Sequence, residues 1–173
     1  VYGGPDFATE PLNNATQAIA QAGSTFKPFA LAAATEAGIG LGTMLPGRSG
    51  TVISGYKVNN YGGESFGKIS LLFATEHSVN TAYVQLTSDI GVDAVMNAAS
   101  RAGIPDDTPG IARNLTFVLG TASPHPIDVA DAYATFAARG VHADPFVIKV
   151  IRGSNGGILF QAAIHTDQAF DSL

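Results

Sequence analysis

An alanine-dense stretch between two glycines is the feature that most restricts the fold of this chain. Residues 26–37 read FKPFALAAATEA, with Gly23 a short distance ahead of them and Gly38 directly behind. Alanine has the highest helix propensity, and a glycine commonly follows the last helical turn. Pro28 suits only the first turn of such a helix, because its nitrogen has no hydrogen to donate. The sequence therefore predicts a helix over residues 26–37 that begins close to Pro28.

Further helices and a few strands are predicted along the rest of the chain, between glycine-rich and proline-rich connections. Helix-forming composition with glycine or proline stops predicts helices at 69–77, 79–90, 92–102 and 127–140. A Ser-Asn-Gly-Gly turn inside 146–163 predicts two strands joined as a hairpin. One strand is predicted near TVISGYKV (51–58), and the opening VYGGPDF reads as a strand that leaves a folded region of a longer protein.

Composition allows one folded domain and argues against several kinds of partner. Of the 173 residues, 46% are apolar and 13% are charged, which suits a chain with a buried core. The net charge of −5, without any basic run, argues against nucleic acid or an anionic membrane surface as a partner. Cysteine is absent and the four histidines include no i, i+4 pair, so neither a metal nor another cofactor is expected.

Ser24 and Lys27 stand three positions apart at the start of the predicted helix, on one face. The same Ser-x-x-Lys spacing occurs at 54–57 and 65–68, but glycine interrupts both of those pairs, and the first lies in a strand-like segment. Helix N–H groups favour an alkoxide at Ser24, and Lys27 can accept its proton if burial and a neighbouring cation lower the lysine pKa. The alternative is an ordinary first-turn serine beside a solvated lysine.

A second motif, HSVN, places Ser78 and Asn80 at the junction of two predicted helices, and it is the only Ser-x-Asn in the chain. The Ser78 hydroxyl can relay a proton between Lys27 and a leaving group, and the Asn80 amide can hold a substrate carbonyl or Lys27 itself. Alternatively, Ser78 only caps the following helix. Together the two motifs make two thirds of the set used by penicillin-binding proteins and serine β-lactamases.

The motifs lie in stretches that closely resemble the transpeptidase domain of class A penicillin-binding proteins. In chain order these stretches are YGGPDFATEPLNNATQA, ATQAIAQAGSTFKPF, NYGGESFGKISLLFATEHSVNTAYVQL and LGTASPHPIDVADAYATFAARGVHADPFVIKV. The resemblance implies an α+β fold of the β-lactamase/transpeptidase type, in which a helical cluster packs on an antiparallel sheet. Residues 1–173 would form a partial transpeptidase domain, its N-terminal portion.

The resemblance also implies a peptidoglycan D,D-transpeptidase that is a target of β-lactams and lies on the extracytoplasmic face of the bacterial membrane, anchored by a segment absent here. Ser24 would be acylated by the D-Ala-D-Ala end of a stem peptide, with Lys27 as base, Ser78 as proton relay and Asn80 as a contact for substrate or Lys27. The Ser24 N–H would be half of the oxyanion hole. Gly62, Gly63 and Phe66 would border the cleft or, alternatively, form a tight turn and a core aromatic.

One family motif is missing, because no Lys-Thr-Gly or Lys-Ser-Gly occurs in the chain. In the family this motif lies beyond the hairpin that corresponds to 146–163. We therefore expect either that a separate chain supplies this part or that the chain alone is inactive. A D,D-carboxypeptidase, a β-lactamase with a carboxylate base (Glu64 and Glu76 are nearest the motifs) and a catalytically silent wall-binding module remain as alternatives.

Overall fold

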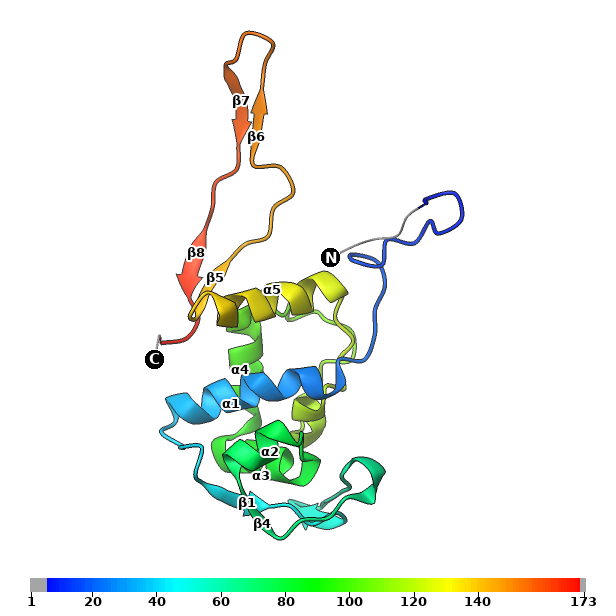
Figure 1. Cartoon of the computed structure of the whole chain (residues 1–173), viewed down its shortest axis with the longest axis vertical. Helices are drawn as coiled ribbons and strands as arrows, with labels where there is room; N and C mark the ends of the chain where they lie inside the picture. Colours follow the sequence, from blue (N-terminus) through cyan, green and yellow to red (C-terminus); the bar gives the residue numbers. More distant parts are fainter. Residues whose placement is uncertain (1–5, 172–173) are drawn as a thin grey trace.

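The computed structural model describes residues 6–171, in which five α-helices gather into one body and a long hairpin projects from it (Figure 1). Three short 3-10 helices, labelled η, stand beside these helices in the described residues. The helical elements are η1 (Gly23–Phe26), α1 (Lys27–Glu36), η2 (Tyr61–Gly63), α2 (Leu71–Glu76), α3 (Asn80–Ile90), α4 (Val92–Ala102), η3 (Leu115–Leu119) and α5 (Pro126–Ala137). No helix among residues 6–171 is long and apolar enough to cross a bilayer.

The strands of the described residues pair two by two, always antiparallel, into four small sheets. The pairs are β1 (Met44–Pro46) with β4 (Lys68–Ser70), β2 (Thr51–Ile53) with β3 (Tyr56–Val58), β5 (Val141–Ala143) with β8 (Thr166–Gln168), and β6 (Val150–Arg152) with β7 (Ile158–Gln161). β1 and β4 lie against α2 and α3, whereas β6 and β7 form the hairpin at the top of Figure 1.

Helix α1 runs through the middle of the body and packs against α3, α4 and η3. Its alanines Ala30, Ala33 and Ala34 are buried, and their small size lets neighbouring helices approach closely. Two aromatic side chains pack together at the start of the helix: the rings of Phe26 and Phe29 lie edge to face with centroids 5.3 Å apart. The alanine-rich stretch therefore forms the centre of the core.

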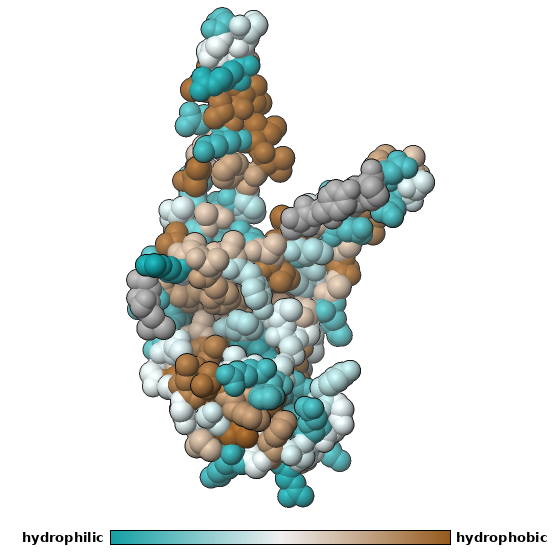
Figure 2. Space-filling view, in the orientation of Figure 1, coloured by the Kyte–Doolittle hydropathy of each residue, from teal (hydrophilic) through white to brown (hydrophobic). Residues whose placement is uncertain are grey.

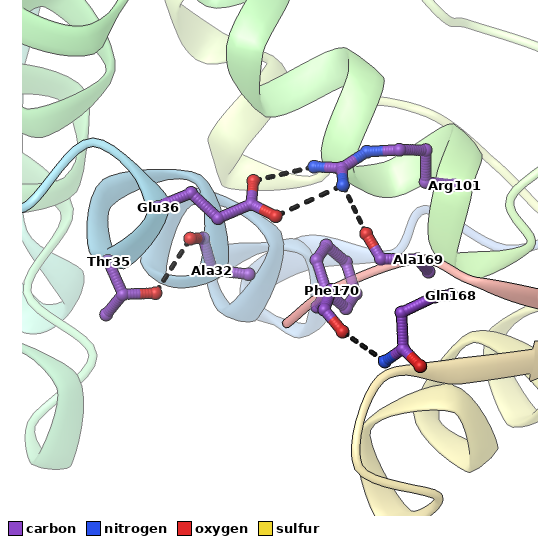
Figure 3. A network of polar contacts seen from close by, with 7 residues as sticks. All are labelled: Ala32, Thr35, Glu36, Arg101, Gln168, Ala169 and Phe170. Atoms are coloured by element: carbon purple, nitrogen blue, oxygen red, sulfur yellow. Dashed lines mark hydrogen bonds and ion pairs between the residues drawn. The ribbon is translucent and has the colours of Figure 1, made fainter. Parts of the chain in front are cut away.

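Arg101 fastens the end of β8 to α1 and α4 (Figure 3). Its guanidinium pairs with both carboxylate oxygens of Glu36, at 2.7 and 3.1 Å, and donates to the Ala169 carbonyl. The same guanidinium lies 5.0 Å from the Phe170 ring centroid. Phe170 in turn stacks on Phe136 of α5 with centroids 5.2 Å apart. The polypeptide that returns from the hairpin is thus tied back onto the helical body.

All five predicted helices are confirmed, with ends displaced by a few residues. Helix α2 begins later than predicted because residues 68–70 pair with β1 before the chain turns into the helix. The single strand predicted near 51–58 is wrong: the segment is a hairpin, because Ser54 (φ 47°) and Gly55 (φ 86°) form a left-handed turn between β2 and β3. The hairpin predicted within 146–163 is confirmed as β6–β7.

Three further points separate the prediction from the structure. Strands β1, β4, β5 and β8 were not predicted; each is only three residues long. Of the strand predicted at VYGGPDF, residues 1–5 lie outside the described residues, and Asp6 and Phe7 are not in a strand. Helix α5 ends at Ala137, three positions before the predicted end at 140, and its buried residues are Ala132 and Thr135.

Candidate active site

The turn that carries Ser24 is held against a second turn by two glycines. Gly23 adopts φ +58° and donates its N–H to the Gly120 carbonyl at 3.0 Å. Gly120 itself has φ +68°, and a Cβ placed on it would lie 2.0 Å from the Gly23 carbonyl oxygen. Only glycine allows this approach, because any side chain at position 120 would displace the backbone before Ser24. Ser24 then lies on η1, one residue after this contact, with its side chain exposed.

Lys27 is the first residue of α1, and its amine is the centre of the site. The Nζ atom lies 3.1 Å from Ser24 Oγ, 2.8 Å from Ser78 Oγ, 2.5 Å from the Ser78 carbonyl oxygen and 2.7 Å from Asn80 Oδ1. These distances are all within hydrogen-bonding range. The structure thus brings the four predicted catalytic residues together around one nitrogen, from segments more than fifty positions apart.

Ser78 adopts an uncommon backbone conformation that lets two of its oxygens meet Lys27. It sits between α2 and α3 with φ 53°, in the left-handed region that few residues other than glycine occupy. Its N–H donates to the Thr75 carbonyl at 3.2 Å, and the next N–H, of Val79, donates to Ala74 at 2.9 Å. Such conformations persist where the surrounding structure enforces them, and they cluster at functional sites.

Asn80 is oriented by a contact on its other side. Its Nδ2 donates to the Asn59 carbonyl at 3.0 Å, which leaves Oδ1 to accept from Lys27. The neighbouring Asn60 is buried, and its Oδ1 accepts from both the N–H and the hydroxyl of Thr81. The loop before η2 is therefore fixed to the start of α3 and holds the Asn80 amide in one orientation.

Burial changes the acid–base properties of Lys27. The side chain is only 3% exposed, and this desolvation lowers its pKa from 10.5 to about 8. At pH 7 roughly one molecule in ten then carries a neutral amine, compared with about one in three thousand at the unshifted pKa. Among residues 6–171 its polar partners are all oxygen atoms, so the neighbouring cation that we expected to help is not found there. Burial alone accounts for the lowered pKa.

The predicted substrate-binding residues Gly62, Gly63 and Phe66 are not among the contacts of Lys27 in the described part of the chain. Gly62 and Gly63 form η2 with φ values of 60° and 76°. Phe66 is partly buried and packs edge to face on Phe73 with centroids 5.3 Å apart. In the described part of the chain no hydrogen bond or ring contact joins these three residues to Lys27, so their role in binding stays a prediction.

Two contributors to the site escaped the sequence analysis. Tyr83 is fully buried on α3, and its ring centroid lies 5.6 Å from Lys27 Nζ. Asn59 acts through its backbone carbonyl, which no side-chain motif reveals. A tyrosine within an apolar helix ordinarily indicates core, so the sequence offered no signal for Tyr83 beyond its distance of three positions from Asn80.

Other kinds of site find little support in residues 6–171. No cluster of three histidine, aspartate or glutamate side chains suited to a metal ion occurs there. Within the same residues no carboxylate contacts any of the four site residues through a hydrogen bond or ion pair. A groove of about 380 Å³ between α1, α5 and the chain end is lined by Leu31, Phe136 and Phe170, away from Lys27 Nζ and its partners.

Comparisons with known proteins show the family of this chain. The family model described as "Penicillin binding protein transpeptidase domain" matches residues 2–171. Penicillin-binding protein 1A of Mycobacterium tuberculosis is 39% identical over 160 residues, which cover 85% of this chain and 19% of that protein. The chain therefore spans about a fifth of the length of this curated relative.

Solved structures give the same result for the fold. The PonA1 protein of M. tuberculosis in complex with penicillin V superposes with a TM-score of 0.85 at 36% identity, over 99% of this chain and 48% of that one. Penicillin-binding protein A of M. tuberculosis, solved as a ceftriaxone acyl-enzyme, superposes with a TM-score of 0.82 at 25% identity, over 98% of this chain and 43% of that one. Because the family model covers nearly all of the sequence and a curated relative exceeds one third identity, this chain belongs to the family of penicillin-binding protein transpeptidase domains.

Proposed function

We propose that this chain forms the nucleophile-bearing part of a peptidoglycan D,D-transpeptidase, with Ser24 as the acylated residue. The single observation that carries this proposal is the position of Lys27 Nζ, 3.1 Å from Ser24 Oγ and 2.8 Å from Ser78 Oγ. Acyl transfer by serine requires a nucleophile within hydrogen-bonding distance of a base, and a second hydroxyl on the same base suits a proton relay.

In the first half of the reaction, the neutral Lys27 amine takes the Ser24 hydroxyl proton while Oγ bonds to the carbonyl carbon of the D-Ala-D-Ala peptide. The Ser24 N–H would donate to the oxyanion, as the family resemblance implies. The C–N bond then breaks, and the proton passes from Lys27 through the Ser78 hydroxyl to the departing D-Ala nitrogen. Asn80 holds the Lys27 amine in place through the 2.7 Å contact with Oδ1.

In the second half, an amine of a neighbouring stem peptide attacks the Ser24 ester and forms the cross-link, and Ser24 regains its proton. A β-lactam would acylate Ser24 in the same way, because its strained amide resembles the D-Ala-D-Ala peptide. The solved relatives bind such compounds: one structure holds penicillin V and another is a ceftriaxone acyl-enzyme. The lack of a contacting carboxylate among residues 6–171 supports the transpeptidase over a β-lactamase that needs such a base.

The third family motif has to come from elsewhere in the proposed enzyme. No Lys-Thr-Gly or Lys-Ser-Gly is present, and this chain covers 48% of the PonA1 chain that it superposes on. We infer that the remaining part of the domain, in the parent protein or as a separate chain, supplies the cation for the substrate carboxylate and the second oxyanion donor. The assembled enzyme would act at the extracytoplasmic face of the cytoplasmic membrane, where peptidoglycan is cross-linked.

A fluorescent penicillin tests the proposal in the full-length parent protein. We expect one covalent adduct, located at Ser24 by peptide mass spectrometry, and none in Ser24→Ala. The matched control is Ser65→Ala, which removes the serine of another Ser-x-x-Lys pair and should leave labelling unchanged. Labelling of Ser24→Ala at the normal rate would overturn the assignment of the nucleophile.

The lifetime of the adduct separates the candidate activities. An adduct that persists for hours supports the transpeptidase, whereas release within minutes indicates a hydrolase on the same scaffold. A parent protein that folds but acquires no adduct would be a silent wall-binding module.

A further inference from the structure

Lys27 has a partner that the family motifs do not include, the ring of Tyr83. This tyrosine is fully buried on α3, and its ring centroid lies 5.6 Å from Lys27 Nζ. That distance is within the range in which a cation is attracted by the face of an aromatic ring. The other contacts of the amine are four oxygen atoms of Ser24, Ser78 and Asn80. Among residues 6–171, Tyr83 therefore supplies the aromatic surface against which this amine lies.

The hydroxyl end of Tyr83 reaches the turn that carries Ser78. Tyr83 Oη lies 2.7 Å from Thr75 Oγ1, and the Thr75 hydroxyl donates to the Leu71 carbonyl at 2.8 Å. Because Thr75 has only one hydroxyl hydrogen, Tyr83 is the donor in their mutual contact. The carbonyl of the same Thr75 accepts the Ser78 N–H at 3.2 Å. One tyrosine thus contacts the base with its ring and braces the proton-relay turn with its hydroxyl.

The left-handed backbone conformation of Ser78 is unfavourable and needs stabilising contacts of this kind. At φ 53° the residue pays a conformational cost that neighbouring contacts must offset. Thr75 provides one of these contacts, and Thr75 is itself held at its side chain by Tyr83 and at its backbone within α2. If the turn relaxed, both Ser78 oxygens would leave Lys27, because the same residue provides them.

We propose that Tyr83 is a positioning residue for acylation: its ring holds the Lys27 amine between Ser24 and Ser78, and its hydroxyl, through Thr75, fixes the Ser78 turn. This inference rests on the proposed transpeptidase function. It assigns two separable effects to one side chain. The ring acts on the charge state and place of the base, and the hydroxyl acts on the geometry of the relay.

The ring effect has a direction that a purely structural role would not produce. An aromatic face stabilises the ammonium form of Lys27, whereas burial of the amine favours the neutral form. Weakening the ring's negative face, without changing its size, should therefore move the midpoint of the acylation rate to lower pH. The neutral amine would then appear at a more acidic pH than in the unmodified protein.

A graded series of ring substitutions in the full-length parent protein tests this effect. In four variants, position 83 carries phenylalanine, monofluorophenylalanine, difluorophenylalanine or trifluorophenylalanine. Each added fluorine withdraws electron density from the ring and changes its size little. The measurement is the second-order rate constant of acylation by a fluorescent penicillin between pH 6 and 9.5. We expect the midpoint to fall progressively, by roughly half to one pH unit over the series. The same series at Phe117, a buried ring that contacts Phe26 and not Lys27, should leave the midpoint in place.

The hydroxyl effect is tested by Tyr83→Phe and Thr75→Val. Each removes one member of the Tyr83–Thr75 contact, and each should lower the acylation rate about threefold to tenfold at every pH without moving the midpoint. Thermal unfolding of the variants identifies any that fail to fold. If Tyr83→Phe is among them, Thr75→Val, which keeps the Tyr83 ring, still tests the hydroxyl effect, and 3-fluorotyrosine at position 83, which keeps the hydroxyl, tests the ring effect.

The outcomes separate this inference from the function on which it rests. If the unmodified protein forms no adduct at Ser24, the proposed function fails. If the adduct forms but the midpoint stays constant through the fluorinated series, the ring effect is overturned. Rates of Tyr83→Phe and Thr75→Val within twofold of the unmodified protein would overturn the hydroxyl effect.

Discussion

The helical body and the β6–β7 hairpin both carry large apolar side chains, but the body buries them and the hairpin exposes them. In the body, rings such as Phe26, Phe29 and Phe117 are at most 1% exposed. In and beside the hairpin, Val147 is fully exposed, Leu159 is 73% exposed and Phe160 is 48% exposed. Figure 2 shows the apolar side chains gathered along the hairpin, where it projects from the body.

This difference separates what local sequence can build from what needs distant contacts. The hairpin forms from its turn and from cross-strand pairs such as Ile151 opposite Phe160, which are near neighbours in the sequence. The site in the body joins Lys27 to Ser78 across 51 positions. An isolated two-stranded hairpin is only marginally stable, so it adds little to the free energy of unfolding of the body. The close packing of the body, by contrast, fixes the positions of the site residues.

Replacing the base should produce the largest loss. In Lys27→Met of the parent protein, we expect the rate of acylation by penicillin to fall by about 10²–10⁴-fold, because no group remains to accept the Ser24 proton. Stopped-flow labelling measures this rate. Lys149→Met, in the exposed segment that leads to β6, is the matched control and should react normally. A loss smaller than tenfold in Lys27→Met would mean that another group serves as the base.

Removing an aromatic ring from the centre of the body should strongly lower the free energy of unfolding. Phe29 is fully buried between Phe26 and Phe136, so Phe29→Ala should lower the free energy of unfolding by about 3–5 kcal/mol. Urea denaturation of this chain measures the change. A cost below about 1 kcal/mol would contradict the view that α1 is the centre of the core.

A methyl group at Gly120 should disturb the nucleophile from a distance. Because a Cβ there would lie 2.0 Å from the Gly23 carbonyl oxygen and the residue has φ +68°, Gly120→Ala should destabilise the fold by about 1–3 kcal/mol. It should also slow acylation, since the Ser24 turn has to move. Gly156→Ala, at φ +81° with open space around it, is the control and should change unfolding without changing acylation. Normal acylation in Gly120→Ala would show that the two turns need not touch.

The pH dependence should follow Lys27. Because burial lowers its pKa to about 8 and the neutral amine is the base, the acylation rate should be low at acidic pH, rise through pH 8 and level off above it. Between pH 7 and 8 we expect roughly a fivefold increase, as the neutral fraction rises from about a tenth to a half. A stopped-flow pH series checks this, and a midpoint close to 10.5 would mean that Lys27 is solvated during the reaction.

A substitution on the hairpin should have the smallest effect. Phe160→Ser removes a half-exposed ring that pairs only across the hairpin, so the free energy of unfolding of this chain should change by less than about 0.5 kcal/mol. Denaturation beside Phe29→Ala makes the comparison direct. A loss above 2 kcal/mol would show that the hairpin packs against the body in solution.

The helices and the four catalytic candidates could be predicted from the order of the amino acids alone. Alanine density, glycine stops and Pro28 depend on neighbouring residues, so α1 and its start were predictable, as was the hairpin from its Ser-Asn-Gly-Gly turn. The short strands β1, β4, β5 and β8 were not predictable, because three residues carry almost no periodic signal and their pairing depends on distant partners.

The way in which those candidates meet depends on tertiary packing and could not be read from the sequence. The left-handed turn at Ser78, the Asn59 carbonyl behind Asn80 and the ring of Tyr83 beneath Lys27 all arise where α1, α2 and α3 pack together. The lowered pKa of Lys27 has the same origin, because desolvation is a property of the surroundings and not of the lysine. Spacing could place a serine and a lysine one turn apart, but burial among distant residues lowers the lysine pKa toward the range in which its amine can accept a proton.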